Sequence, residues 1–103
     1  MASIKITAPR TITQVLSVAY LASEYEITSA RGVEIWTDDE TKAFTIRYRM
    51  GQDADNIERV VVAALAGNQA PSAWIAGTGA PGVSLFLNIK SGAGTPNAKI
   101  FIW

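Results

Sequence analysis

The stretch Ala43-Phe44-Thr45-Ile46-Arg47-Tyr48-Arg49-Met50 alternates between apolar and polar side chains without a break. Successive side chains of a β-strand point to opposite faces, so this pattern predicts a strand with one buried side. The residues expected in the core are Phe44, Ile46, Tyr48 and Met50. The residues expected on the other face are Thr45, Arg47 and Arg49.

Short apolar segments recur on both sides of this stretch, and runs rich in Gly, Pro, Asn and Asp separate them. They cover residues 4–7, 33–37, 57–65, 74–76, 83–90 and 98–103. Short strands at this spacing, with turn signals between them, are typical of sandwiches and barrels. We therefore expect an all-β fold, a single β-sandwich or jelly-roll-like domain that spans residues 1–103.

Three of these segments carry more specific expectations. Residues 33–37 and 43–50 are separated by a polar loop, which predicts a hairpin. The run 57–65 is almost continuously apolar, which favours a strand that is buried on both faces, although a helix also fits this run. In the last segment Ile100 and Ile102 should face the core, and the strand should be paired inside a sheet because an exposed apolar edge aggregates.

The segment from Thr11 to Tyr25 fits two structures. Ile12, Val15 and Ala19 recur at helical spacing, whereas Leu16, Val18 and Tyr20 alternate as in a strand. β-Branched and aromatic residues favour the strand, and the Ala, Leu and Glu content favours one short helix near residues 11–25. Both interpretations stay open.

The composition excludes many kinds of catalytic and binding site. The chain has 103 residues with no Cys and no His, so thiolate nucleophiles, imidazole bases and metal sites built from these residues are absent. The net charge is +0, which does not fit a nucleic-acid-binding surface. We expect no enzyme activity, no cofactor and no metal. The start of the chain does not resemble a signal peptide, and no apolar run is long enough for a membrane span.

Two acidic segments are candidates for a site. Asp38-Asp39-Glu40 and Asp53-Ala54-Asp55-Asn56 could bind calcium through oxygen ligands or pair carboxyl groups as a small hydrolase does. Turns explain both segments better, because Asp and Asn bond their own backbone. The glycine-rich segment 77–82 lacks the Lys-Ser/Thr of a phosphate-binding loop and is interpreted as a strand connector.

The best candidate for a ligand-binding surface is a face with Trp36, Arg47 and Arg49. In the predicted hairpin these side chains share one face, where an indole could stack on a sugar ring and guanidinium groups could add polar contacts. The same face could instead be an ordinary exposed surface with a Glu34–Arg pair, or a subunit interface.

A second surface is predicted from three aromatic residues. Phe86, Phe101 and Trp103 point away from the aliphatic core positions of their strands, and only 17% of the residues are charged. These features favour an interface in a homo-oligomer, a trimer or a dimer. The alternative is a two-sided core, in which both strands are fully covered within the protein.

The function expected from these observations is binding or assembly. The first expectation is a self-assembling structural or attachment module, such as a subunit of a virion, fibre or other multimeric assembly. Such a subunit would be located in a virion or in a cytoplasmic assembly. The alternative is a carbohydrate-binding module that uses Trp36, Trp74 or Trp103. A small carboxylate-based hydrolase is the third and weakest expectation.

Overall fold

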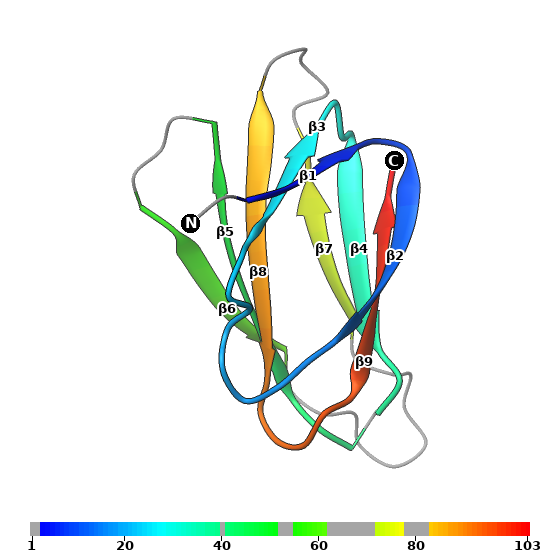
Figure 1. The fold of residues 1–103 in the computed structure, drawn as a ribbon, viewed down its shortest axis with the longest axis vertical. Helices are drawn as coiled ribbons and strands as arrows, with labels where there is room; N and C mark the ends of the chain where they lie inside the picture. The colour runs from blue at the N-terminus through cyan, green and yellow to red at the C-terminus, as the bar shows by residue number, and fades with distance from the viewer. Residues whose placement is uncertain (1–2, 40, 52–54, 62–71, 78–82) are drawn as a thin grey trace.

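The computed structural model describes residues 3–39, 41–51, 55–61, 72–77 and 83–103, and the regular elements among them are all β-strands. The strands are β1 (Ile4–Thr7), β2 (Arg10–Val15), β3 (Tyr25–Thr28), β4 (Gly32–Thr37), β5 (Phe44–Met50), β6 (Ile57–Val61), β7 (Ser72–Ala76), β8 (Ser84–Ser91) and β9 (Asn97–Ile102). They form two packed sheets, so the predicted β-sandwich is confirmed (Figure 1). None of the described residues forms a helix that could cross a membrane.

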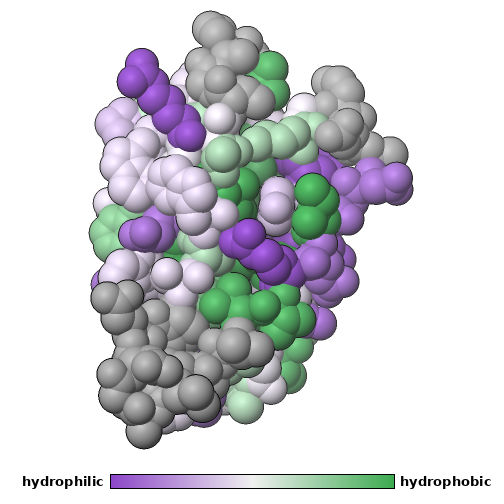
Figure 2. All heavy atoms as spheres, turned by 180° about the vertical axis from the view of Figure 1, so that it is seen from behind, coloured by the Kyte–Doolittle hydropathy of each residue, from purple (hydrophilic) through white to green (hydrophobic). Residues whose placement is uncertain are grey.

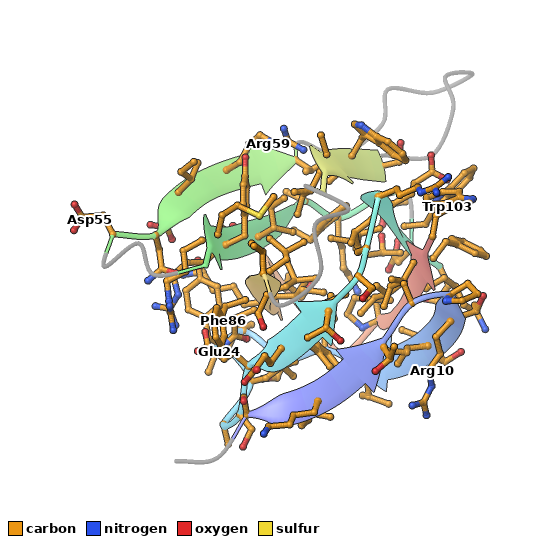
Figure 3. All side chains as sticks on the ribbon, turned by 90° about the horizontal axis from the view of Figure 1, so that it is seen from above. Arg10, Glu24, Asp55, Arg59, Phe86 and Trp103 are labelled. Carbon is orange, nitrogen blue, oxygen red and sulfur yellow. The ribbon has the colours of Figure 1, made fainter. Side chains whose placement is uncertain are left out.

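The two sheets have different strand orders. The five-stranded sheet has the order β1-β3-β8-β5-β6, and the four-stranded sheet has the order β2-β9-β4-β7. Strands β1 and β3 pair in parallel, whereas the other pairs are antiparallel. Seen from above, the sheets stand side by side, and β1 continues into β2 at the edge where the chain crosses from one sheet to the other (Figure 3).

The core lies between the sheets and follows the alternation of the central strands. In β8 the inward residues Leu85, Leu87 and Ile89 are at most 2% exposed. In β9 the inward residue Ile100 is fully buried, and β9 lies between β2 and β4. The predicted orientation of the last strand and its pairing inside a sheet are therefore confirmed.

The hairpin predicted for residues 33–50 is wrong. β4 pairs with β7 and β9 in the four-stranded sheet, whereas β5 pairs with β6 and β8 in the five-stranded sheet. Each strand has one apolar face, and the loop between them is long enough to cross the sandwich, so the two faces cover each other across the core. Alternation identifies such strands but does not say which strands pair.

The run at residues 57–65 also differs from its prediction in the part that the structure describes. β6 is an edge strand, and its residues Ile57 and Val60 are 56% and 61% exposed. Glu58 and Arg59 within β6 are the kind of charged residues that protect an edge. The rest of the run, residues 62–65, lies outside the described residues. On the face of the molecule that is seen from behind, hydrophobic and hydrophilic residues lie next to one another (Figure 2).

Residues 11–25 form neither one strand nor a helix. The strand β2 ends at Val15, and residues 17–24, which we call the strap, lead to β3. Asn88 of β8 is buried and holds the strap: its Oδ1 accepts from the Leu21 amide at 2.8 Å, and its Nδ2 donates to the Leu21 carbonyl at 3.1 Å. Asn88 occupies an outward position of β8, between the inward residues Leu87 and Ile89, and is buried there because the strap covers it.

Candidate functional site

The outer face of the four-stranded sheet carries all three tryptophans of the chain. Trp36 lies on β4 and Trp74 on β7, while Trp103 directly follows β9, and their exposed fractions are 40%, 52% and 49%. Phe101 of β9 is half-buried on the same face. We call these four residues the aromatic face. They meet there because each occupies an outward position of a neighbouring strand, so strand pairing gathers residues that are distant in sequence.

A glycine gives Trp74 its position. The ring of Trp74 lies over Gly32 of β4, where an added Cβ would be only 2.3 Å from the ring. On its other side Trp74 contacts Trp103, with ring centroids 5.2 Å apart and planes inclined by 56°. This is a tilted aromatic pair of the favourable kind. The two indoles therefore support each other at one end of the aromatic face.

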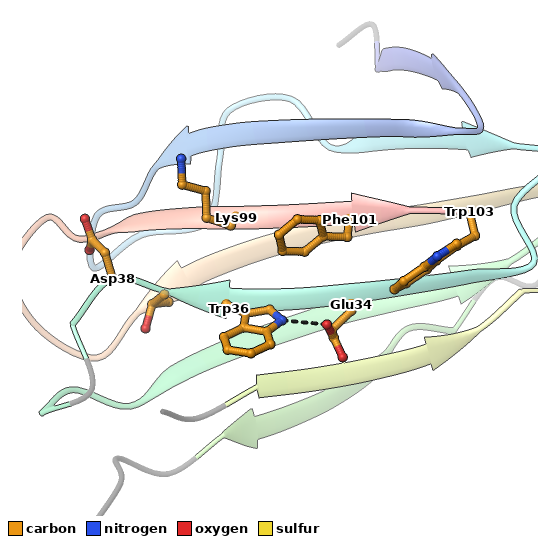
Figure 4. A pocket seen from close by; sticks show the side chains of 7 residues that line it. Glu34, Trp36, Asp38, Lys99, Phe101 and Trp103 are labelled. Carbon is orange, nitrogen blue, oxygen red and sulfur yellow. Dashed lines mark hydrogen bonds between the residues drawn. The ribbon is translucent and has the colours of Figure 1, made fainter. Parts of the chain in front are cut away.

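A groove runs along the aromatic face between β4 and β9 (Figure 4). Its volume is about 320 Å³, and it is lined by Glu34, Trp36, Thr37, Asp38, Lys99, Phe101 and Trp103. This volume is at the lower end of the usual range for small-molecule sites. The Trp103 amide donates to the Gly32 carbonyl on β4 at 3.0 Å. Gly32 is four residues from Trp36, which at the rise of a strand is about 13 Å. The groove is therefore long enough for an extended ligand.

Charged and polar groups lie among the rings. Glu34 of β4 is half-buried and pairs across the sheet with Trp74. Its Oε1 accepts from the Trp36 indole Nε1 at 2.7 Å. Both carboxylate oxygens of Asp38 accept from Asn97, Oδ1 from the amide at 2.9 Å and Oδ2 from Nδ2 at 3.0 Å. Lys99 Nζ donates to Thr13 Oγ1 at 2.9 Å on β2. These hydrogen bonds fix the Trp36 ring and direct the Lys99 ammonium toward β2.

Arg47 and Arg49 are not part of this face. They lie on β5, on the outer face of the other sheet, so the predicted grouping of Trp36 with Arg47 and Arg49 is wrong. The error follows from the hairpin, which would have put the three side chains on one surface. The strap covers both arginines: the Arg47 guanidinium lies 4.1 Å from the centre of the Tyr20 ring, and Arg49 pairs with Glu24 at 3.1 Å.

Tyr20 is the main contact of the strap. Its hydroxyl donates to Glu58 Oε1 at 2.6 Å, and Lys90 Nζ lies 4.7 Å from the ring centre. Burial and the Glu58 carboxylate raise the pKa of Tyr20 to about 12, although the nearby Arg47 charge works in the opposite direction. Tyr20 thus joins the strap to β5, β6 and β8, and the arginines help to hold it.

The three aromatic residues predicted for an interface are divided between the two outer faces. Phe101 and Trp103 belong to the aromatic face. Phe86 lies on the other sheet, where the Arg49 guanidinium is 4.0 Å from its ring centre. Viewed from above, Phe86 and Trp103 lie on opposite sides of the sandwich (Figure 3).

The acidic segments form turn contacts where they are described. Asp39 Oδ1 accepts from the Thr41 amide at 3.0 Å and from its hydroxyl at 2.5 Å, and Lys42 Nζ lies 3.0 Å from Oδ2. The hydrogen bonds from Thr41 and Lys42 lower the pKa of Asp39 to about 2. Within the part of the chain that the structure describes, no three Asp or Glu residues are grouped to hold a metal ion. Residues 40, 53–54 and 78–82, which include parts of both acidic segments and of the glycine-rich segment, lie outside the described residues.

Sequence reasoning missed the partners of the tryptophans. Lys99 and Gly32 were not expected at a site, although Lys99 shares its side of β9 with Phe101 and Trp103. Gly32 has no side chain, and only its pairing with Ala76 shows that Trp74 passes over it. Comparison of the chain with protein-family models, with curated proteins and with solved structures finds no match.

Proposed function

We propose that this protein is a carbohydrate-binding module whose ligand lies in the groove of the aromatic face. The observation that supports this proposal is the gathering of Trp36, Trp74 and Trp103 on one outer face, each at least 40% exposed. An exposed indole offers a flat apolar surface with a polar N–H edge. Sugar rings with equatorial substituents have apolar C–H faces that stack on such surfaces, and their hydroxyl groups need hydrogen-bonding partners nearby.

The polar residues of the groove favour a sugar over a protein partner. The cores of protein interfaces are depleted of Lys, Glu and Asp, yet Lys99, Glu34 and Asp38 all line this groove. A protein surface that covered them would have to compensate for the loss of their hydration. A sugar carries hydroxyl groups that can replace water at these side chains. The mixture of rings and charges therefore fits a polyhydroxylated ligand.

The length of the groove favours an oligosaccharide. Its two aromatic ends, Trp36 and Trp103, are separated along β4 by about 13 Å, because the Trp103 amide donates to Gly32, four residues from Trp36. Glu34 and Phe101, which pair with each other, lie between these ends. A chain of linked sugar rings can contact Trp36 and Trp103 together, whereas a single ring reaches one of them. Affinity should therefore rise with the number of linked sugars.

Isothermal titration calorimetry with β-1,4-linked hexamers of glucose and of N-acetylglucosamine tests this proposal. We expect at least one hexamer to bind with a dissociation constant in the micromolar to millimolar range, and its monomer to bind more weakly. Trp103→Ala should weaken binding by about tenfold or more, which corresponds to about 1.4 kcal/mol.

The matched control for Trp103→Ala is Val60→Ala, which removes an apolar side chain that is 61% exposed on β6 of the other sheet. This control should bind like the wild type. If Trp103→Ala and Val60→Ala bind the hexamer equally well, the aromatic face is not the binding surface.

Self-assembly through the same face is the second candidate function. It is favoured by the exposed apolar area of the three tryptophans, because such patches often mark contacts between proteins. Multi-angle light scattering at micromolar concentration tests the expected homo-oligomer. A trimer or dimer that Trp74→Ala converts to a monomer would support assembly, and a monodisperse 11.0 kDa species would contradict it.

A further inference from the structure

The charges in the groove are not balanced, and this bears on the class of sugar. Two carboxylates, Glu34 and Asp38, line the groove together with one ammonium group, that of Lys99. Lys99 is directed toward Thr13 on β2, at 2.9 Å. Glu34, in contrast, lies between the strand positions of Trp74 on β7 and Phe101 on β9, which pair with it on either side. The centre of the groove is therefore negative.

The aromatic rings, like the carboxylates, favour a ligand with a positive charge. The face of an indole carries negative electrostatic potential and attracts an ammonium group within about 6 Å of its centre, most strongly for Trp. Trp36 is held beside Glu34 by the 2.7 Å hydrogen bond from its Nε1. Glu34 thus presents a carboxylate next to an exposed indole, a pair that suits a cation with apolar surroundings.

Resting on the proposed function, we infer that the groove selects amino sugars with a protonated amine, such as β-1,4-linked glucosamine, over neutral and acidic sugars. Glu34 is the residue that sets this preference, because it is the carboxylate in the middle of the aromatic face. The two oxygens of Asp38 are already bonded to Asn97, so Asp38 adds long-range attraction. An acidic sugar is repelled by both carboxylates.

The test compares three hexamers by calorimetry at about pH 5.5, below the pKa of an aliphatic amine: glucosamine, N-acetylglucosamine and galacturonic acid. The wild type should bind the glucosamine hexamer about tenfold more tightly than the N-acetylated one, and the galacturonic acid hexamer most weakly. Salt should reduce this preference, because it screens exposed charges.

The decisive variant is Glu34→Gln, which keeps an oxygen that can accept from Trp36 and removes the charge. It should bring the ratio between the glucosamine and N-acetylglucosamine affinities close to one. The charge-matched control is Asp55→Asn, at the far end of the molecule from Trp103 (Figure 3), and it should keep the wild-type ratio.

The outcomes separate this inference from the proposed function. If the wild type binds all three hexamers equally, or prefers the acidic one, the amino-sugar preference is wrong and carbohydrate binding stands. The same conclusion follows if Glu34→Gln keeps the tenfold ratio. If no hexamer binds, both the inference and the proposed function fail.

Discussion

Gly32 shows how one residue without a side chain determines where an aromatic ring lies. Its position on the outer face of β4 leaves the space that the Trp74 ring occupies. A methyl group there would meet the ring at 2.3 Å, so the ring has to move. The geometry of the Trp74–Trp103 pair therefore depends on a glycine that no motif identifies.

Gly32→Ala should weaken binding of the preferred hexamer by displacing Trp74. If Gly32→Ala acts through Trp74, the losses of binding free energy in Gly32→Ala and Trp74→Ala are not additive, because Trp74→Ala then has no well-placed ring left to remove. Calorimetry on the two single variants and the double variant measures this coupling. Additive losses would show that Gly32 acts on binding by another route.

Trp36→Ala tests a second ring in isolation. The side chain is 40% exposed and lies outside the core, so the melting temperature should change by only a few degrees while glycan binding is lost. Thermal melts and calorimetry on the same sample make the comparison. A collapse in stability would mean that Trp36 supports the fold and would remove it from the site.

At the scale of single elements, the strap connects stability to pH. The pKa of Tyr20 is about 12 in the folded protein and 10.0 in an ordinary tyrosine. As the pH rises, the unfolded chain loses the Tyr20 proton before the folded protein does. The contribution of protonated Tyr20 to the free energy of unfolding is therefore complete below pH 10 and disappears as the pH rises toward about 12. Tyr20→Phe has no such proton. Its unfolding free energy should fall less steeply than that of the wild type between these pH values, as urea titrations can measure.

Equal pH slopes for the wild type and Tyr20→Phe would contradict the role of the Tyr20–Glu58 hydrogen bond. Tyr25, whose pKa is also raised by burial, is present in both proteins and cancels in the comparison.

Strand β9 carries the element-scale test of the core. Ile100 is fully buried in the middle of the four-stranded sheet, so Ile100→Ala should lower the free energy of unfolding by about 2–5 kcal/mol. Ile57→Ala makes the same chemical change at a site that is 56% exposed on β6 and should cost about 0.5 kcal/mol or less. Urea unfolding measures both values. Similar losses in the two variants would contradict the assignment of β9 to the core and β6 to an edge.

The sequence predicted which residues form strands better than it predicted which strands pair with one another. Alternation located the inward residues of β5, β8 and β9, because burial on one face is a local property of a strand. Whether β4 pairs with β5 depends on contacts across the sandwich, and the sequence between them fits both a hairpin and a crossing loop. Because β4 and β5 lie in different sheets, Trp36 is separated from Arg47 and Arg49.

The candidate site was predictable in part for the same reason. The outward orientation of Phe101 and Trp103 follows from β9 alone. Their meeting with Trp74 requires the order β9-β4-β7, which no local pattern contains. The strap could not be predicted, because its residues 17–24 bind Asn88 and Arg49 through single long-range contacts rather than through a periodic pattern.

At the scale of the whole molecule, the sandwich has two outer faces with different roles. The outer face of the five-stranded sheet is crossed by the strap, which uses Tyr20, Leu21 and Glu24 to contact β5, β6 and β8. The outer face of the four-stranded sheet carries the exposed tryptophans and the groove. This asymmetry is why we assign ligand binding to one face and a stabilising role to the polar and cationic contacts of the other.

Titration of the ¹⁵N-labelled protein with the β-1,4-linked glucosamine hexamer, followed by nuclear magnetic resonance, tests this assignment most directly. Each tryptophan contributes one indole N–H signal, so the aromatic face has three reporters of its own. We predict that the indole signals of Trp36, Trp74 and Trp103 shift with a common dissociation constant, while the amide signals of the strap do not move. Unchanged indole signals, or shifts confined to the strap and β5, would contradict the account.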